Sequence, residues 1–354
     1  MSFKSVVNGK RRAIMRGLTK NIGRSALNRD AHGISSSDIR RVLISRPNSR
    51  LGNQLLITPL VQEISNTFPN CKIDLFVRGN ISFILFENYE CIERIIRLPK
   101  KPFKELFKYI KVWFSLERYS YDIVINVDKN SSSGRLSTQF SNARFKFFND
   151  VEEDLRAKYE DYEHMAKFPV YNFRRNLIQL GFKDVDIEKP MPVLDIRLSS
   201  AEITTGKEIL DSLVDKARET IAIYTFATGD KCYSKDWWLN AYDRLKAEYG
   251  EKYNILEVLP IENVSQIDFH APSYYSRDIR EMTALINNTA VFIGADSGIM
   301  HLASAAQTPV VGLFSVTNIE KYKPYNDGSV AIDTNIMDID DIVAATDKIL
   351  GMKK

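Results

Sequence analysis

The sequence has 354 residues, of which 44% are hydrophobic and 27% charged, with a net charge of +4 at pH 7. These values are ordinary for a soluble globular protein of two domains. No apolar run reaches the roughly 18 residues that a bilayer span needs, and residues 1–10 lack the apolar core of a secretory signal. The three cysteines are odd in number and far apart, which fits neither a disulfide framework nor a zinc site. We therefore expect a cytoplasmic protein.

The positive charge is concentrated at the start of the chain. Residues 1–41 hold ten basic side chains against two acidic ones, a charge of +8, so residues 42–354 carry −4. An acidic body argues against a nucleic-acid groove as the main function.

A basic leader, residues 1–39, precedes the first domain. Ile14, Leu18 and Ile22 recur in it at helical spacing. One interpretation is an amphipathic helix through which residues 1–30 make peripheral contact with the anionic inner face of the cytoplasmic membrane. The other is a basic arm with no specific partner.

Strand and helix patterns alternate along the first half of the chain. The expected strands are residues 41–46, 73–77 and 121–127, and the expected helices are 54–68, 103–117, 150–163 and 171–180. Residues 129–139, which follow the third strand, are predicted to be a polar loop. Such alternation is typical of a parallel, doubly wound sheet.

The second half restarts the pattern after residues 189–192, where two prolines favour a domain boundary. Helices are expected at 201–214, from a cap at Asp236 to about Tyr249, at 278–287 and at 299–306, and strands at 220–225, 254–259, 290–295 and 310–314. The predicted domains are therefore residues 40–190 and 191–354.

The turn at Asp296, Ser297 and Gly298 stands between a buried strand and a helix of small residues. The free N–H groups and the dipole of a helix N-terminus bind phosphate well, and ligands of open α/β sheets sit at this edge. An ordinary capped helix explains the same turn. His301 in the first helical turn, where a core would favour a hydrophobic residue, favours the phosphate site.

Three blocks of the chain resemble the heptosyltransferase family, glycosyltransferase family 9. They are residues 41–60, with Arg50-Leu-Gly52-Asn53, residues 228–238, and residues 293–301, Ile-Gly-Ala-Asp-Ser-Gly-Ile-Met-His. Residues 309–318 resemble the continuation of the last motif, with Ser-Val-Thr in place of Gly-Pro-Thr. The resemblance covers about residues 40–350.

This resemblance implies an α/β GT-B architecture of two Rossmann-like doubly wound domains facing across a cleft. The N-terminal domain would hold the acceptor and the C-terminal domain a nucleotide-sugar donor. The implied reaction is inverting transfer of a heptose or related sugar to a hydroxyl of lipopolysaccharide or another glycolipid or polysaccharide acceptor. It would need no metal and no other cofactor, and no nucleic acid would be a partner.

The predicted donor site gathers N–H groups, an imidazole and a cation that stabilise a departing diphosphate. Thr228 and Gly229 lie at the exit of the neighbouring strand, and Glu262 follows the next strand, where a carboxylate suits the ribose hydroxyls. The donor-binding residues are Thr228, Gly229, Lys235, Glu262, Asp296, Ser297, Gly298 and His301.

The acceptor side departs from the family at Asn53, where many members carry the aspartate expected to act as general base. An amide cannot accept a proton near neutral pH. Asp128, at the end of a strand, is the predicted substitute; the other interpretation, which the sequence alone favours, is a loop cap for the serines that follow. Asn53 would orient the acceptor, and Gly52, Arg46 and Arg50 would bind it. The other interpretation of the two arginines is that they are solvent-exposed charges of the loop with no ligand.

Asn53 also leaves room for an alternative, a catalytically silent nucleotide-sugar binder or complex subunit. A nicotinamide-dependent enzyme is disfavoured because no Gly-x-Gly-x-x-Gly turn follows the first strand.

Overall fold

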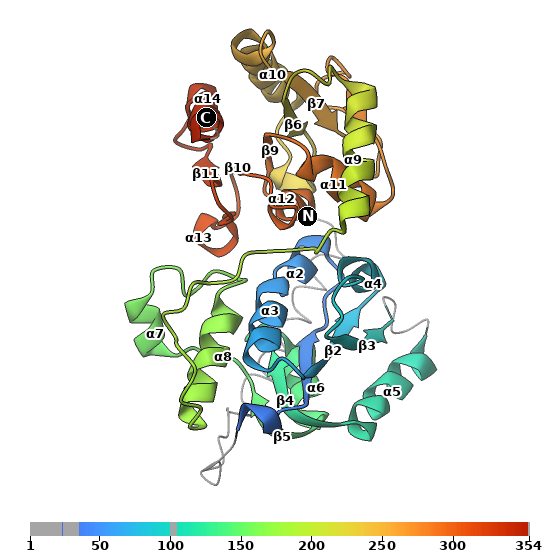
Figure 1. Cartoon of the computed structure of the whole chain (residues 1–354), viewed down its shortest axis with the longest axis vertical. Coiled ribbons are helices and arrows are strands. Elements are labelled where there is room, and N and C mark those ends of the chain that lie inside the picture. The colour runs from blue at the N-terminus through green and yellow to red at the C-terminus, as the bar shows by residue number, and fades with distance from the viewer. Residues whose placement is uncertain (1–22, 24–34, 100–104, 353–354) are drawn as a thin grey trace. The chain divides into compact units, whose positions relative to one another are not determined.

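The computed structural model describes Gly23 and residues 35–99 and 105–352 (Figure 1). These form two compact units. Unit 1 comprises the described residues of Met1–Ser49, Pro59–Phe83 and Tyr89–Pro192, and unit 2 comprises those of Arg50–Thr58, Ile84–Asn88 and Val193–Lys354. The predicted membrane contact of residues 1–30 lies, apart from Gly23, outside the described residues.

Unit 1 is built on a five-stranded parallel sheet with the order β3-β2-β1-β4-β5. Its strands are β1 Arg41–Arg46, β2 Lys72–Arg78, β3 Ile92–Leu98, β4 Ser120–Asn126 and β5 Asn142–Phe147. The chain winds outward from β1 to β3 and then returns to the other side of β1 with β4. The switch point of this sheet, where ligands of doubly wound folds bind, is therefore between β1 and β4.

The helices of the first half differ from the predictions in several places; a helix at 81–85 was not predicted, and the one expected at 150–163 spans only 153–158. They are η1 Ser36–Asp38, α2 Leu51–Leu55, α3 Thr58–Thr67, α4 Ile81–Leu85, α5 Leu106–Ser115, η2 Leu116–Arg118, α6 Ser132–Phe140, α7 Glu153–Lys158 and α8 Phe168–Gln179. The single helix expected at 54–68 is two helices, and α2 packs with unit 2.

The polar loop predicted at 129–139 is wrong. Ser131 caps a helix there, because its hydroxyl accepts a hydrogen bond from the N–H of Gly134 at 3.1 Å. A serine run that reads as a loop therefore supplies a helix start.

Unit 2 has a six-stranded parallel sheet with the order β11-β10-β9-β6-β7-β8. Its strands are β6 Thr220–Tyr224, β7 Asn254–Val258, β8 Ser273–Tyr274, β9 Val291–Ala295, β10 Val310–Phe314 and β11 Val330–Asp333. Every residue of β6, β7, β9 and β10 is buried, as expected for parallel strands covered on both faces. The switch point here lies between β6 and β9.

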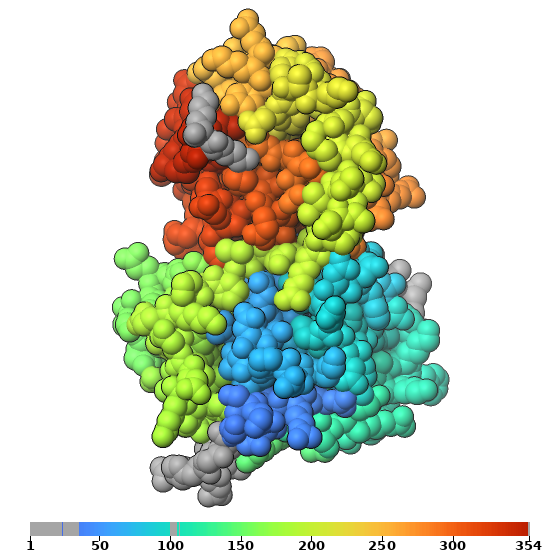
Figure 2. All heavy atoms as spheres, viewed as in Figure 1, coloured from blue at the N-terminus to red at the C-terminus, as the bar shows by residue number. Residues whose placement is uncertain are grey.

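The helices of unit 2 follow the predicted alternation. They are α9 Ser200–Leu213, η3 Gly229–Lys231, α10 Lys235–Tyr249, α11 Ile279–Asn287, α12 Gly298–Ala305, α13 Ile319–Tyr322 and α14 Ile339–Met352. Helix α9 lies at the surface of the unit (yellow-green in Figure 2). The predicted cap of α10 at Asp236 is wrong, because Ser234 is the N-cap and its hydroxyl accepts the N–H of Trp237 at 3.2 Å.

Candidate functional site

Three loops meet at the carboxyl ends of β6, β9 and β10 in unit 2. These strands are neighbours in the sheet, and their exit loops carry Lys231, Asp296 and Thr317 respectively. The side chains of all three residues are in hydrogen-bond contact. Because β6 and β9 flank the switch point, this cluster stands where a doubly wound sheet binds its ligand.

Asp296 is the centre of the cluster. Its side chain is 4% exposed, and its Oδ2 accepts hydrogen bonds from Lys231 Nζ and Thr317 Oγ1, both at 2.5 Å. A buried carboxylate is stable only with such partners. A lysine ammonium has three N–H donors, and Asp296 takes one. Asp296 therefore fixes the position of Lys231 while leaving donors for an anion.

His301 lies beside this carboxylate, with Nε2 at 3.8 Å from Asp296 Oδ1. Burial lowers the pKa of His301 to about 4; Asp296 opposes the change and the charge of Lys231 adds to it. The imidazole is consequently neutral at neutral pH. It can donate a hydrogen bond to a leaving group, but the positive charge at this site comes from Lys231.

The N-terminus of α12 completes the unit 2 site. The hydroxyl of Ser297 caps the helix by accepting the N–H of Met300 at 3.2 Å. The first N–H groups of a helix have no partner within the helix, and its dipole favours an anion there. The N-terminus of α12 is thus both a capped helix start and the element at which the phosphate site is predicted.

Helix α2 packs against the first turn of α12. A Cβ atom on Gly52 would stand 2.7 Å from His301 Cδ2, and one on Gly298 would stand 3.1 Å from Leu51 Cβ. A Cβ on Gly52 would therefore force the imidazole to move, whereas one on Gly298 would need only a small shift of Leu51. This packing brings Gly52 and its neighbour Asn53, predicted on the acceptor side, next to the predicted donor residues His301 and Gly298.

The other predicted donor residues lie on the segments that follow β6 and β7. Thr228 and Gly229 form the exposed turn just before Lys231, with Gly229 at φ +68°. Lys235 pairs instead with Asp268 at 2.7 Å, and both side chains are half exposed. Glu262 is exposed beyond β7 and, after burial, is the next largest cause of the raised pKa of Tyr224, at the end of β6.

Lys231 and Thr317 were missed as site residues. Lys231 is two residues beyond Gly229, closer to the strand exit than Lys235, which begins a capped helix. Thr317 belongs to the Ser-Val-Thr block that departs from the family pattern, and it contributes its hydroxyl to Asp296. In both cases proximity to the strand end is the signal that would have identified the residue.

Unit 1 carries an ion pair at its own switch point. Arg46 ends β1 and its Nη1 lies 2.6 Å from Oδ2 of Asp128, which follows β4. The other carboxylate oxygen accepts the N–H of Asn130 at 2.9 Å. Asp128 therefore does cap the loop before α6, and it is also 25% exposed at the ligand edge of the sheet.

The structure separates the two predicted acceptor arginines. Arg46 is buried and belongs to unit 1, whereas Arg50 is an exposed residue that precedes α2 and belongs to unit 2.

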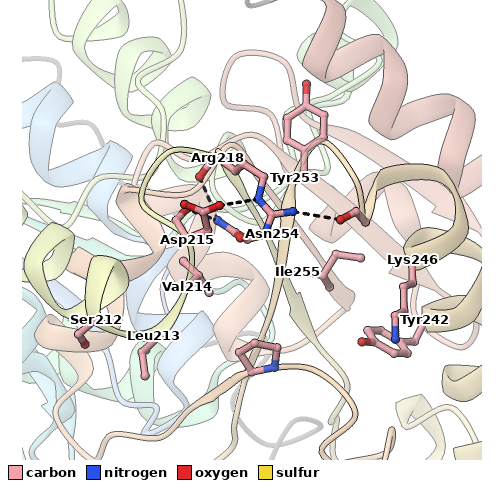
Figure 3. A pocket seen from close by; sticks show the side chains of 12 residues that line it. Ser212, Leu213, Val214, Asp215, Arg218, Tyr242, Lys246, Tyr253, Asn254 and Ile255 are labelled. Carbon is pink, nitrogen blue, oxygen red and sulfur yellow. Dashed lines mark hydrogen bonds and ion pairs between the residues drawn. The ribbon is translucent and has the colours of Figure 1, made fainter.

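A groove of about 430 Å³ lies at the opposite edge of the unit 2 sheet (Figure 3). Asn254, the first residue of β7, donates to the carbonyl groups of Asp215 and Arg218 at 2.8 and 3.0 Å. Arg218 in turn donates to the Asp215 carboxylate at 3.1 Å and to the Gly250 carbonyl at 3.2 Å. The polar side chains of the groove thus connect loops at the amino ends of the unit 2 strands. The Asp296 cluster lies at the carboxyl ends of these strands.

No helix in residues 35–99 or 105–352 is long and apolar enough to cross a membrane. The same residues contain no group of three or more His, Cys, Asp or Glu side chains placed to hold a metal ion.

The chain is similar to several proteins of known class. Residues 276–344, which include Asp296, His301 and Thr317, match the family model described as "Glycosyltransferase family 9 (heptosyltransferase)". Lipopolysaccharide heptosyltransferase 3 of Escherichia coli strain K12 is 23% identical over 84% of this chain and 95% of its own length. The lipopolysaccharide core heptosyltransferase OpsX of Haemophilus influenzae is 20% identical over 78% and 80%.

The resemblance to glycosyltransferase family 9 is confirmed. With it the prediction that the protein is a glycosyltransferase is also confirmed.

Solved structures of family 9 proteins share the fold. A glycosyltransferase family 9 structure from Veillonella parvula has a TM-score of 0.68 at 16% identity, covering 90% of this chain and 99% of its own. The E. coli heptosyltransferase WaaC with ADP has a TM-score of 0.63 at 15% identity, covering 87% and 99%. The predicted fold class, GT-B with two Rossmann-like units, is confirmed.

Proposed function

We propose that this protein transfers a heptose, with inversion, from an ADP-linked donor to a hydroxyl of a lipopolysaccharide acceptor at the cytoplasmic side of the membrane. The observation that carries the proposal is the Lys231–Asp296–Thr317 cluster at the N-terminus of α12. Support for the donor and acceptor comes from relatives named lipopolysaccharide heptosyltransferases and from WaaC structures with ADP and with a fluorinated ADP-heptose.

The donor diphosphate would sit on the first turn of α12. As the bond from the anomeric carbon to the diphosphate breaks, negative charge grows on the phosphate oxygens. Lys231 supplies a cation held in place by Asp296, and the helix N-terminus supplies N–H groups and its dipole. Neutral His301 adds a hydrogen bond. These groups are fixed before the donor arrives, so little reorganisation is needed during the reaction, and no metal is required.

The remaining predicted donor residues would hold the rest of the nucleotide. Thr228 and Gly229, in the turn before Lys231, would meet the same diphosphate. Glu262 would accept hydrogen bonds from the ribose hydroxyls. Lys235 would contribute at longer range, since its ammonium is directed to Asp268.

Asp128 would take the proton of the acceptor hydroxyl. Inversion requires the hydroxyl oxygen to attack the anomeric carbon from the face opposite the diphosphate, and the proton then passes to a base. Asp128 exposes part of its carboxylate, and buried Arg46 fixes its orientation at 2.6 Å. Asn53, on the segment beside His301, would orient the acceptor by hydrogen bonds, with Arg50 near it for anionic groups.

The proposal is tested by separate binding and transfer assays. Purified full-length protein is titrated with ADP, UDP, GDP and CMP and with matching nucleotide sugars while its melting temperature is recorded. We expect stabilisation by ADP compounds, and release of ADP when ADP-heptose and a heptose-deficient lipopolysaccharide are both present. If no nucleotide stabilises the protein at millimolar concentration, the donor site is refuted.

A second candidate is a nucleotide-sugar binder without transfer activity, which Asn53 favours because the usual base is missing there. It predicts stabilisation by the donor but no ADP release with any lipopolysaccharide acceptor. It also predicts that Asp128→Asn has no effect beyond stability.

A further inference from the structure

Helix α5 of unit 1 (teal in Figure 1) exposes large apolar side chains. Phe107 is 89% exposed, Phe114 is 65% exposed and Ile110 is 43% exposed. Isolated apolar side chains on a surface are normal, but these three lie at positions i, i+3 and i+7 and therefore on one face of the helix. We name this set the α5 patch.

The α5 patch is not the face that folds the protein. Tyr109, Val112 and Trp113 on the other side of the helix pack against a buried cluster of the unit 1 sheet. Trp113 also lies edge-on to Phe76 in β2, at 5.6 Å between ring centroids. The helix is thus already anchored by a complete apolar face, and folding does not account for the second one.

Two exposed lysines of α5 flank the α5 patch, in a stretch of sequence rich in basic residues. In the sequence, residues 100–118 contain six basic and two acidic side chains, a net charge of +4, whereas residues 42–354 together carry −4. Lys108 and Lys111 are exposed on the helix itself. Large apolar side chains flanked by lysines on one exposed helix face are typical of helices that lie in the interface of an anionic bilayer.

We propose that the α5 patch docks this protein on an anionic phospholipid surface, with Phe107, Ile110 and Phe114 in the interfacial region and the lysines at the head groups. Its residues belong neither to the leader, residues 1–39, nor to the ion pairs Arg46–Asp128 and Lys231–Asp296 at the switch points. Docking would hold the enzyme at the surface in which a lipid-linked acceptor is embedded. It does not depend on the proposed transfer reaction, because it concerns binding to lipid without donor or acceptor.

The test is co-sedimentation of full-length protein with vesicles of phosphatidylethanolamine and phosphatidylglycerol, compared with phosphatidylcholine vesicles. The double variant Phe107→Ser and Phe114→Ser should bind the anionic vesicles at least about tenfold more weakly than the wild type. The control Ile336→Ser removes a side chain that is 83% exposed in unit 2 and should bind like the wild type. Equal melting temperatures of the three proteins exclude unfolding as the cause.

Two further measurements distinguish lipid binding by the α5 patch from membrane contact through the leader and from dimerisation. The emission of Phe107→Trp should shift to the blue with anionic vesicles and stay unchanged with phosphatidylcholine. Lys108→Glu with Lys111→Glu should weaken binding and reduce its salt dependence. Unchanged vesicle binding of the Phe107/Phe114 double variant would overturn the proposal and leave the leader as the membrane contact. A wild-type dimer that this variant converts to monomer, with vesicle binding unchanged, would overturn it in favour of a second copy of the chain.

Discussion

At the switch point of unit 1 the buried partner of the ion pair is the cation, whereas at the switch point of unit 2 it is the carboxylate. Arg46 is 5% exposed beneath an Asp128 that is 25% exposed, and Asp296 is 4% exposed beneath a Lys231 that is 34% exposed. In both units the cation lies at or after the carboxyl end of the unit's first strand in the chain, β1 or β6, and the carboxylate follows the strand on the other side of the switch point, β4 or β9. The same topology therefore presents a negative group in one unit and a positive group in the other.

This reversal matches the two chemical tasks of a glycosyltransferase. An outward carboxylate can accept a proton from a hydroxyl, and an outward ammonium can neutralise a diphosphate. The buried partner fixes the geometry in each case. Substitutions that remove one member of a pair should thus separate the catalytic step from donor binding.

The largest effect is expected from Asp128→Asn. It keeps an oxygen for the N–H of Asn130 but removes the proton acceptor, so kcat should fall by about 10²–10⁴. The donor Kd should stay unchanged, because Asp128 belongs to the unit 1 pair. Steady-state kinetics and donor titration of the same preparation check both. A kcat within about threefold of the wild type would show that another group is the base.

The second largest effect is expected on the stability of the protein at acid pH, through His301 in the Asp296 cluster. Since burial lowers the pKa of His301 from 6.5 to about 4, the unfolded chain binds the proton first as pH falls. The free energy of unfolding should therefore fall by about 3 kcal/mol as the pH falls from 6.5 to 4. Below pH 4 this contribution should level off. His301→Gln should remove this contribution. Urea unfolding of both proteins from pH 7 to 4 measures it; parallel curves would mean that His301 is not a buried neutral group.

A smaller effect is expected where α2 meets α12. Gly52→Ala places a Cβ 2.7 Å from His301 Cδ2, which forces the imidazole to move and costs about 2 kcal/mol. Donor affinity should fall as well, because His301 stands beside Asp296. Gly351→Ala in α14 has no atom within 4 Å of its new Cβ and serves as the control. Equal melting temperatures of Gly52→Ala and the wild type would contradict the close packing.

The smallest effect concerns Lys235. Its pair with Asp268 is half exposed on both sides, and such pairs contribute less than about 1 kcal/mol. We expect Lys235→Met to change the donor Kd by less than about fivefold. A loss larger than that of Lys231→Met would show that Lys235 is the main cation of the donor site.

The sequence predicted the central strands β6, β7, β9 and β10 of unit 2 because their signals are local, whereas it did not predict the short elements β8, β11 and α13. A buried run, an N-cap and a helix of small residues follow one another within residues 290–306, and the structure has β9 and α12 there. The serine run after Asp128 failed because the same residues can cap a helix or form a loop. Only the packing of α6 on the sheet decides between them.

The side-chain partners could not be predicted, because they depend on contacts between distant segments. Lys231 and Asp296 are 65 residues apart, and their pairing follows from β6 and β9 being neighbours in the sheet. The motif around Lys235 predicted that lysine for the donor site, but the lysine that contacts Asp296 is Lys231, four residues earlier in the chain. Likewise, nothing local indicates that α2 joins unit 2 and places Gly52 against His301.

The most direct test of a diphosphate site at the unit 2 switch point is calorimetric titration of ADP-heptose, or of ADP where the sugar is lacking, into the wild type and Lys231→Met. Losing a charged hydrogen-bond donor to phosphate costs about 1.5–3 kcal/mol. The variant should thus bind about 10–100-fold more weakly, with Lys235→Met as the matched control. Equal affinity of Lys231→Met and the wild type would contradict the account.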